Sequence, residues 1–206
     1  FDKDKEILIQ YPVGNSRTSY TIPDTVYDIY DWSFELCDAL QSVTIPESVD
    51  DIEDGAFCEC TALESVEMPD YLDYIGSWAF SGCSKLRTIA IPYGIEEIYN
   101  DTFSNCTRLT QVTFPVSLYD IDYEAFYNCN NIREILYEGT WDDWDYIDGV
   151  YDNDYLSSAE IFVIPDVDYE AYASGVYLYW DDVYDVDEPV GYAVYQKVAG
   201  SWKLLL

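Results

Sequence analysis

The sequence contains no histidine, which excludes several classes of active site at once. Neither Ser-His-Asp nor Cys-His catalysis can be assembled without an imidazole, and histidine-ligated zinc or iron is excluded as well. The phosphate-binding motif GxxxxGK[ST], the dinucleotide motif GxGxxG and the metalloprotease motif HExxH are all missing. Carboxylate-pair catalysis remains, but it needs a cleft that raises one carboxyl pKa, and the sequence predicts none. We therefore expect no catalytic residue, no cofactor and no enzyme activity.

Basic residues are also scarce, with 9 Lys and Arg against 41 Asp and Glu and a net charge of −32. So negative a chain repels polyanions, and we expect no nucleic-acid partner. The sequence has no run of 18 apolar residues, so no membrane insertion is expected within it.

What the sequence does have is a strict period. Prolines recur every 23 residues, at Pro23, Pro46, Pro69, Pro92 and Pro115. Further columns repeat with them: Ile29, Ile52, Ile75, Ile98 and Ile121; Phe34, Phe57, Phe80, Phe103 and Phe126; Cys37, Cys60, Cys83, Cys106 and Cys129. A period of this length predicts a solenoid, in which each turn buries its apolar side chains against its neighbours.

Each turn also carries one predicted strand, in which apolar and polar residues alternate before the proline ends the pattern. These strands are 42–45, 65–68, 88–91 and 111–114, and we expect them to stack in parallel about 4.8 Å apart. The isoleucine and phenylalanine columns are expected on the return side, in short extended or 3₁₀ segments.

The stretches TIPESVDDIEDGAFCECTALESVEMP and YLDYIGSWAFSGCSKLRTIAIP resemble the BspA-like leucine-rich repeats of bacterial and protozoan surface proteins. Residues 8–23 are similar to the opening segment of such arrays, and residues 135–163 to their closing unit, with Gly139, Thr140 and Trp144 in place. The resemblance implies a leucine-rich-repeat solenoid over residues 1–164. It would have an opening cap at 1–22, five turns at 23–137 and a closing cap at 138–164. It further implies a non-enzymatic adhesin or interaction scaffold, extracellular or at the bacterial cell surface.

Residues 165–206 lose the period and are predicted to form strands, with a hairpin at Ala199-Gly200. Trp180, Tyr192 and Val194 resemble the core of a fibronectin type III domain, of which only the first half is present. We expect a truncated β-sandwich-like segment here. Together with the lack of a Met at position 1, this segment leads us to interpret the sequence as part of a longer chain.

The five periodic cysteines are predicted to form an inward-facing column of small buried side chains. Disulfides between successive turns are the alternative, which a spacing of about 4.8 Å disfavours because bridged Cβ atoms lie about 3.5–4.5 Å apart. Cys58 is out of phase and is predicted to be an exposed free thiol, with inter-chain pairing as the alternative. One C-x-C pair without histidine is a weak metal motif.

An acidic run suggests calcium, which we weigh against a structural role. It comprises Asp142, Asp143, Asp145, Asp148, Asp152, Asn153 and Asp154. Its spacing does not match the EF-hand loop, so we interpret the segment as part of the closing cap and assign no metal ligand, with calcium binding as the alternative.

The chain is rich in aromatic residues, with 22 Tyr and 6 Trp, most of them outside the core columns and beside Asp or Glu. Rigid rings beside acidic groups are typical of recognition surfaces, so we predict binding of a protein or extracellular-matrix ligand. The candidate residues are Tyr27, Tyr30, Trp32, Tyr71, Tyr74, Trp78, Tyr93, Tyr99, Tyr119 and Tyr123. Trp32 and Trp78 share a column two turns apart, about 10 Å, so glycan binding is an alternative. A structural spacer is a further one, in which the rings only cover the core beneath them.

Overall fold

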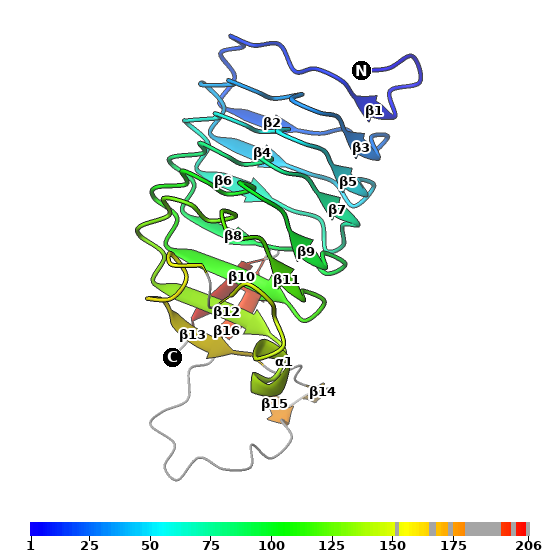
Figure 1. Ribbon diagram of the computed structural model, residues 1–206. Coiled ribbons are helices and arrows are strands. Elements are labelled where there is room, and N and C mark those ends of the chain that lie inside the picture. The colour runs from blue at the N-terminus through cyan, green and yellow to red at the C-terminus, as the bar shows by residue number, and fades with distance from the viewer. Residues whose placement is uncertain (151–152, 165–167, 173–174, 180–194, 199–200, 205–206) are drawn as a thin grey trace.

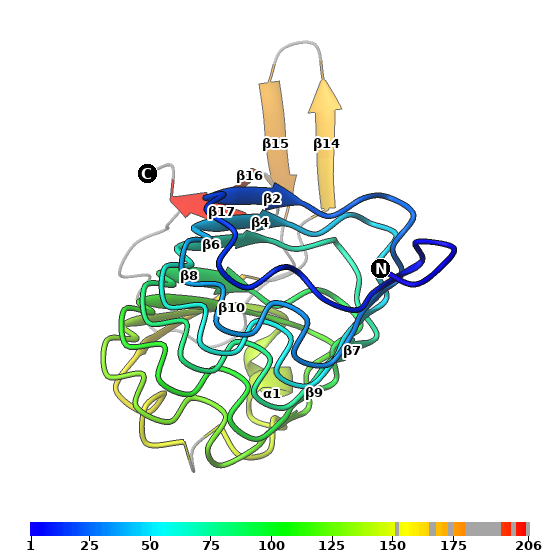
Figure 2. The same ribbon diagram turned by 90° about the horizontal axis from the view of Figure 1, so that it is seen from above.

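The computed structural model describes residues 1–150, 153–164, 168–172, 175–179, 195–198 and 201–204, and its repeats wind into an elongated solenoid (Figure 1). Two rows of strands run along it. Seen from above, each turn follows a closed circuit, with the longer strands and the shorter strands on different sides of the core (Figure 2). The predicted solenoid is confirmed.

The first row contains one parallel strand per turn. Its members are β2 (Ser19–Thr21), β4 (Ser42–Thr44), β6 (Ser65–Glu67), β8 (Thr88–Ala90), β10 (Gln111–Pro115), β12 (Glu134–Glu138) and β13 (Glu160–Val163). Paired residues are 23 apart through most of the row, as in Val43 with Val66 and Val112 with Ile135. The row has about seven turns rather than five, because the segments expected as caps each contribute a strand, β2 and β13.

The second row consists of two-residue strands, so the expectation of short extended segments is confirmed. They are β1 (Ile7–Leu8), β3 (Asp28–Ile29), β5 (Asp51–Ile52), β7 (Tyr74–Ile75), β9 (Glu97–Ile98) and β11 (Asp120–Ile121). In each, one side chain enters the core and the preceding one faces outward. The outward side chains are only half-buried and so contribute to the surface of the solenoid.

Left-handed backbone bends the chain at two corners of each turn. The first corner contains Trp32, Gly55, Trp78 and Asp101, and the second contains Leu36, Glu59, Gly82, Asn105 and Asn128, with φ between 56° and 74°. Glycine and asparagine adopt this conformation readily, whereas other residues do so at a cost. The repeat geometry imposes the conformation whichever residue is present.

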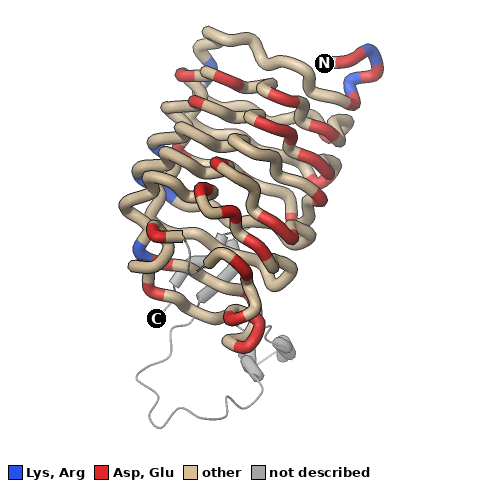
Figure 3. Tube along the Cα trace, in the orientation of Figure 1, with Lys and Arg blue, Asp and Glu red and all other residues tan. Residues whose placement is uncertain are grey.

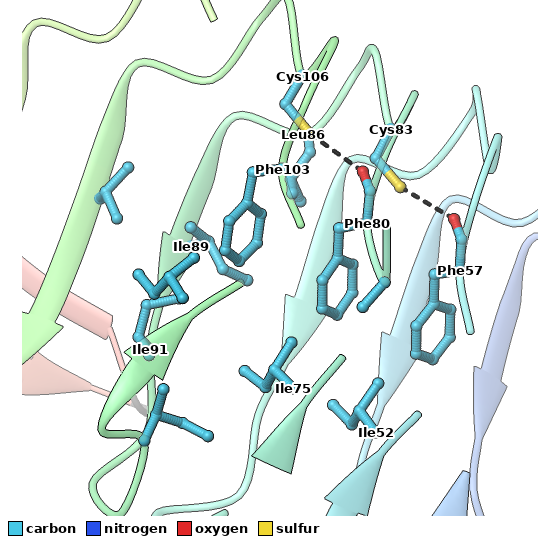
Figure 4. Packing of buried hydrophobic residues seen from close by; sticks show 14 of the residues in the cluster. Ile52, Phe57, Ile75, Phe80, Cys83, Leu86, Ile89, Ile91, Phe103 and Cys106 are labelled. Atoms are coloured by element: carbon cyan, nitrogen blue, oxygen red, sulfur yellow. Dashed lines mark hydrogen bonds between the residues drawn. The ribbon is translucent and has the colours of Figure 1, made fainter. Parts of the chain in front are cut away.

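Between the two rows lies a column of stacked rings (Figure 4). Phe34, Phe57, Phe80, Phe103 and Phe126 stack with centroids 4.7–5.5 Å apart. Tyr11 continues the column at the N-terminal end, 4.9 Å from Phe34.

The buried cysteine column is confirmed, and all six cysteines are free thiols. The structure adds a role that the sequence did not reveal. Cys83 Sγ donates a hydrogen bond to the Phe57 carbonyl over 3.3 Å, and Cys106 Sγ to the Phe80 carbonyl over 3.2 Å (Figure 4). Equivalent bonds recur at Cys60 and Cys129, so the thiols link successive turns through the core.

Helix α1 (Trp141–Trp144) lies at the C-terminal end of the stack. Thr140 caps it: its side chain accepts from the Asp143 N–H, while the Asp143 carboxylate accepts from the Thr140 N–H. The helix buries Trp144 against Tyr137, with ring centroids 5.3 Å apart. This agrees with the role that the resemblance implied for Thr140 and Trp144.

Both rows of strands are interrupted at the same level, which the sequence did not predict. The backbone ladders join β2, β4 and β6, then β8, β10, β12 and β13; on the other side they join β1 to β7, then β9 and β11. Within the described part of the chain, an isolated bridge between Tyr71 and Tyr93 crosses this level, and so do backbone hydrogen bonds outside the strands, such as that from Phe80 N to the Thr102 carbonyl over 2.8 Å. We call the level between β6–β7 and β8–β9 the seam. The strands were expected to form one continuous row, and that expectation is wrong at the seam, although the turns remain stacked there.

The described C-terminal strands form two antiparallel pairs, β14 (Asp168–Tyr172) with β15 (Gly175–Tyr179) and β16 (Tyr195–Val198) with β17 (Ser201–Leu204). The second pair flanks Ala199-Gly200, where a hairpin was predicted, and these two residues lie outside the described part of the chain. Trp180, Tyr192 and Val194 lie outside the described residues. The described strands form two separate two-stranded sheets, and no sandwich is shown among them.

Candidate functional site

One face of the solenoid consists almost entirely of tyrosine and acidic side chains. It is formed by the four positions that flank each buried isoleucine of the second row, two before it and two after. Over five turns these positions are 27, 28, 30 and 31; 50, 51, 53 and 54; 73, 74, 76 and 77; 96, 97, 99 and 100; 119, 120, 122 and 123. Every one is Tyr, Asp or Glu except Gly76, Ser77 and Asn100. We call this surface the acidic tyrosine face.

Charge is distributed unequally around each turn. Acidic segments recur along the side where β3, β5, β7 and β9 lie, whereas basic segments lie along the opposite edge and near the N-terminus (Figure 3). The basic residues within the repeats precede the strands of the first row, at Lys85, Arg87, Arg108 and Arg133. The acidic tyrosine face contains no Lys or Arg to neutralise it.

All ten predicted interaction residues lie on or beside this face. Six belong to it: Tyr27, Tyr30, Tyr74, Tyr99, Tyr119 and Tyr123. Tyr71 and Tyr93 follow prolines at one edge, and Trp32 and Trp78 occupy the first left-handed corner at the other. Eight of the ten are exposed, while Tyr74 and Tyr99 are half-buried.

The structure brings five of these tyrosines together at the seam and leaves the other residues apart. Tyr71, Tyr74, Tyr99 and Tyr119 line a hollow of about 310 Å³, together with Asp73, Gly94, Glu96, Glu97, Ile75 and Ile95. Tyr93 lies at its edge, with its ring centroid 6.0 Å from that of Tyr71. Tyr74 and Tyr99 pack together across the seam, with centroids 5.3 Å apart. We call this hollow the tyrosine pocket.

Two departures from the repeat create the pocket. In neighbouring turns the second residue after the proline is a serine that bonds the previous turn: Ser48 Oγ donates to the Val26 carbonyl, and Ser117 Oγ to the Ile95 carbonyl. At the seam this column contains Tyr71 and Gly94 instead. Gly94 has φ +100°, and a Cβ there would lie 2.3 Å from the Leu72 carbonyl oxygen and 2.7 Å from the Tyr71 ring. The Tyr71 ring can lie where it does only because residue 94 has no side chain.

Two tyrosine hydroxyls of the pocket donate to carboxylates, that of Tyr71 to Asp73 and that of Tyr74 to Asp54. Tyr71 Oη donates to Asp73 Oδ1 over 2.7 Å, and this hydrogen bond raises the pKa of Tyr71. Burial and the nearby Asp54 carboxylate raise the pKa of Tyr74 to about 12. Burial and the Glu97 carboxylate raise the pKa of Tyr99. These phenols therefore stay neutral donors at physiological pH, held by acidic neighbours.

The carboxylates of the face repel one another. The pKa values of Asp28, Asp51 and Glu53 are raised by partial burial and then by neighbouring carboxylates of the same face. The pKa of Glu97 is raised by burial and by Asp120 and Asp122. A cation brought to this surface would relieve that repulsion.

The two tryptophans occupy equivalent corners, each 40% exposed and with φ of 56° and 57°. The Trp32 indole lies over Gly55 of the next turn, where an added Cβ would come within 2.3–2.6 Å of its ring atoms. One face of Trp32 is therefore covered by the backbone.

Sequence reasoning missed the acidic members of the pocket, Asp73, Glu96 and Glu97, together with Gly94. Gly94 could have been noticed in the sequence, because it interrupts a column that otherwise contains mostly Thr and Ser. It also missed Tyr127, Trp141 and Tyr146, which are exposed at the C-terminal end of the solenoid.

Cys58 differs from its prediction, since it is half-buried rather than exposed. Burial, with Glu59 and Glu35 nearby, raises the pKa of its thiol to about 11. The thiolate that disulfide exchange requires is therefore scarce at neutral pH.

The acidic run of the closing segment has structural roles where it is described. Asp143 caps α1, Asp148 forms a backbone bridge with Asp120, and Asn153 donates to the Asp122 carbonyl; Asp152 lies outside the described residues. Across the described part of the chain, no group of three Asp, Glu or Cys side chains is arranged to hold a metal ion. No helix there is long and apolar enough to cross a membrane.

The BspA type leucine rich repeat region matches residues 13–133 of the chain in six copies. Among solved structures, a leucine rich cell surface protein of Faecalibacterium prausnitzii is 35% identical with a TM-score of 0.67, the match covering 69% of this chain and 38% of that protein. A leucine-rich repeat protein of Eubacterium ventriosum is 30% identical with a TM-score of 0.53, covering 63% of this chain and 41% of that one.

The pneumococcal vaccine antigen PcpA shares the fold, with a TM-score of 0.58 at 18% identity over 80% of this chain and 45% of its own. A comparison with curated proteins gave no significant match. The match to the Faecalibacterium prausnitzii protein spans about two fifths of that protein's length.

Repeat period, strand register and sequence similarity agree, and the chain belongs to the BspA-type leucine-rich repeat family, whose members are non-enzymatic repeat proteins and whose structural relatives include bacterial cell-surface proteins.

Proposed function

We propose that this chain is an adhesion or protein-interaction module of a bacterial secreted or cell-surface protein, and that it binds through the acidic tyrosine face. One observation carries the proposal: exposed tyrosines and unneutralised carboxylates occupy a single face over five turns, while the repeats' basic residues lie elsewhere. Tyrosine provides a large contact area at low entropy cost, and a charged face attracts partners of opposite charge. The partner class is therefore a protein or matrix ligand with a basic surface.

The proposal is tested by surface plasmon resonance of the full chain against a panel of purified matrix and host cell-surface proteins, basic and acidic. Asp28→Asn, Asp51→Asn and Asp120→Asn together remove three charges from the face. Glu67→Gln, Glu134→Gln and Glu160→Gln remove three from the strand row and serve as the control. We expect basic ligands to bind, and the first triple variant to lose about tenfold in affinity while the control stays within about twofold. Equal losses, or no ligand in the panel, would contradict the proposal, and the second result would favour a spacer.

A second candidate is glycan binding at the tryptophan corner. Trp32 and Trp78 are equally exposed and have equivalent backbone conformations, which supports a role for both in stacking on sugars. Because one Trp32 face is covered, only its other face is available to stack on a sugar. Retention of the full chain on polysaccharide columns tests this candidate: Trp32→Ala and Trp78→Ala should each abolish retention, with Tyr30→Ala as the control. A parent protein that is not retained excludes it.

The resemblance of residues 165–206 to part of a fibronectin type III domain remains a prediction, as do the boundaries given for the caps and repeats. Comparison of the 1–164 fragment with the full chain, by thermal unfolding and proteolysis, tests both. We expect the fragment to unfold with the cooperativity of the full chain.

A further inference from the structure

The tyrosine pocket has the chemistry of a site for one organic cation. Four tyrosine rings and the carboxylates Asp73, Glu96 and Glu97 line it, and none of its lining residues is basic. The Tyr71 hydroxyl already donates to Asp73 Oδ1, and the Tyr74 hydroxyl donates to Asp54 Oδ1. What the lining offers a ligand is consequently ring faces and carboxylate oxygens, both of which attract positive charge.

The arrangement favours a guanidinium over an ammonium or a metal ion. A guanidinium is planar and weakly hydrated, stacks on aromatic rings and bonds carboxylates through two N–H groups at once. An ammonium is a compact, strongly hydrated charge that gains less from ring faces. Metal coordination is not supported, because the described carboxylates do not converge as a ligand group. A volume of about 310 Å³ has room for one long side chain.

The pocket also lies at the level where both rows of strands are interrupted. Strands β7 and β9, which contribute Tyr74, Ile75 and Glu97 to the lining, are not joined in a ladder, although their counterparts on either side are. Tyr71 and Gly94 replace the serines that bond neighbouring turns elsewhere in the array. The phenylalanine column is also most widely spaced at this level, with 5.5 Å between the ring centroids of Phe80 and Phe103. These features occur together at one level of an otherwise regular array.

We infer that the tyrosine pocket binds an arginine side chain of a protein ligand, between the rings of Tyr71, Tyr74, Tyr99 and Tyr119 and against Asp73, Glu96 and Glu97. This inference rests on the proposed function and identifies the chemical group that the acidic tyrosine face recognises. The rest of the face attracts a basic surface over a distance, and the pocket supplies the specific contact.

The test uses saturation-transfer NMR of the full chain with three probes of matched size: N-acetyl-arginine amide, N-acetyl-lysine amide and N-acetyl-citrulline amide. Citrulline has the shape of arginine without its charge. We expect a Kd for the arginine probe of about 1 mM, weaker binding of lysine, and binding of citrulline at least about tenfold weaker than that of arginine.

Two pairs of variants locate the binding. Glu97→Gln and Tyr99→Ala alter the pocket and should each weaken the arginine probe about fivefold or more. Asp28→Asn and Tyr30→Ala change the same two columns in the turn that lies two before that of Tyr74, with the same loss of charge or ring, and should leave the Kd within about twofold. Melting temperatures of all four variants identify any that fail to fold. Glu97→Gln retains the side-chain size, so its Kd is the primary test of the pocket.

Two results would overturn the inference. Equal binding of arginine and lysine, lost equally in Glu97→Gln and Asp28→Asn, would mean diffuse attraction to the acidic face. No binding of the arginine probe by the parent protein would exclude the pocket outright. Neither result decides the proposed function, because the protein-ligand measurement uses the Asp28, Asp51 and Asp120 variant and leaves the pocket residues intact.

Discussion

At the scale of single residues, the left-handed corners are where the residue type agrees least with the backbone conformation. The second corner contains Gly82, Asn105 and Asn128, which suit a positive φ, but also Leu36 with φ +59°. The left-handed conformation costs an ordinary residue about 1–2 kcal/mol. The Leu36 side chain is 48% exposed and so recovers little of this cost by burial.

We therefore expect Leu36→Asn to raise the free energy of unfolding by about 0.5–1 kcal/mol, because asparagine tolerates this backbone. The urea midpoint of the full chain measures the change. Asn105→Leu is the reciprocal control and should destabilise, since it also removes the 2.9 Å bond from Asn128 Nδ2 to Asn105 Oδ1. A lower midpoint for Leu36→Asn would contradict the expectation.

The thiols give a second prediction at this scale. Burial raises the pKa of Cys83, and the other periodic cysteines are also enclosed by the core. With a pKa of about 11, Cys58 is only about 0.1% thiolate at pH 8. We expect Ellman's reagent to label the native protein slowly and at one thiol at most, and to label all six in guanidinium chloride. Cys58→Ser should remove the native reaction; rapid labelling of several native thiols would show that the cysteine column is open.

At the scale of the turn, the constant register makes the repeat a removable unit. β2 pairs with β4 and β4 with β6 at the same offset, so excising residues 24–46 places β2 beside β6 with every core column in phase. Repeat arrays tolerate such changes because each turn contacts only its neighbours. We expect this deletion to fold and unfold cooperatively, with a smaller urea m-value because less surface is buried.

Deletion of residues 24–35 is the control, because it removes the second-row half of one turn and leaves the remainder out of phase. We expect it to abolish cooperative unfolding, as monitored by circular dichroism. If both deletions behave alike, register is not what holds the stack together.

The same regularity explains which elements the sequence predicts. Core columns such as Phe57, Phe80 and Phe103 contain one residue type in every turn, so strands and burial follow from the period. The tyrosine pocket depends on Tyr71 and Gly94 in a surface column of small polar residues, where two exceptions resemble ordinary variation. The tyrosines of the site could be found from composition, whereas Asp73, Glu96 and Glu97 look like any other surface charge until the turns are stacked. The number of turns was underestimated because β2 and β13 lie in segments that lack the full set of columns.

At the scale of the whole molecule, a net charge of −32 acts against folding. The shifted carboxyl pKa values show which part of the surface has the strongest repulsion. The carboxyl pKa values of Asp28, Asp51, Glu53 and Glu97 are raised in the folded chain, first by burial and then by neighbouring carboxylates. The folded state therefore binds protons more tightly than the unfolded state at these groups. Their contribution to stability is fully present below the unfolded pKa of about 4 and is lost as pH rises through the raised values.

We accordingly expect the melting temperature to be higher at pH 5 than at pH 8 in low salt, by about 3–5 °C. Sodium chloride at 0.5 M should raise it at pH 8, where the carboxylates are charged, and have less effect at pH 5, because screening acts only on charges that are present. Asp51→Asn should raise the melting temperature at pH 8 more than Glu134→Gln does, since Glu134 lies on the strand row, where its side chain accepts a bond from Gln111. A melting temperature that peaks at pH 8 and ignores salt would mean that the repulsion along the acidic tyrosine face does not limit stability. In that case the face could not gain stability from a basic ligand through charge neutralisation, and ring contacts would have to supply the affinity.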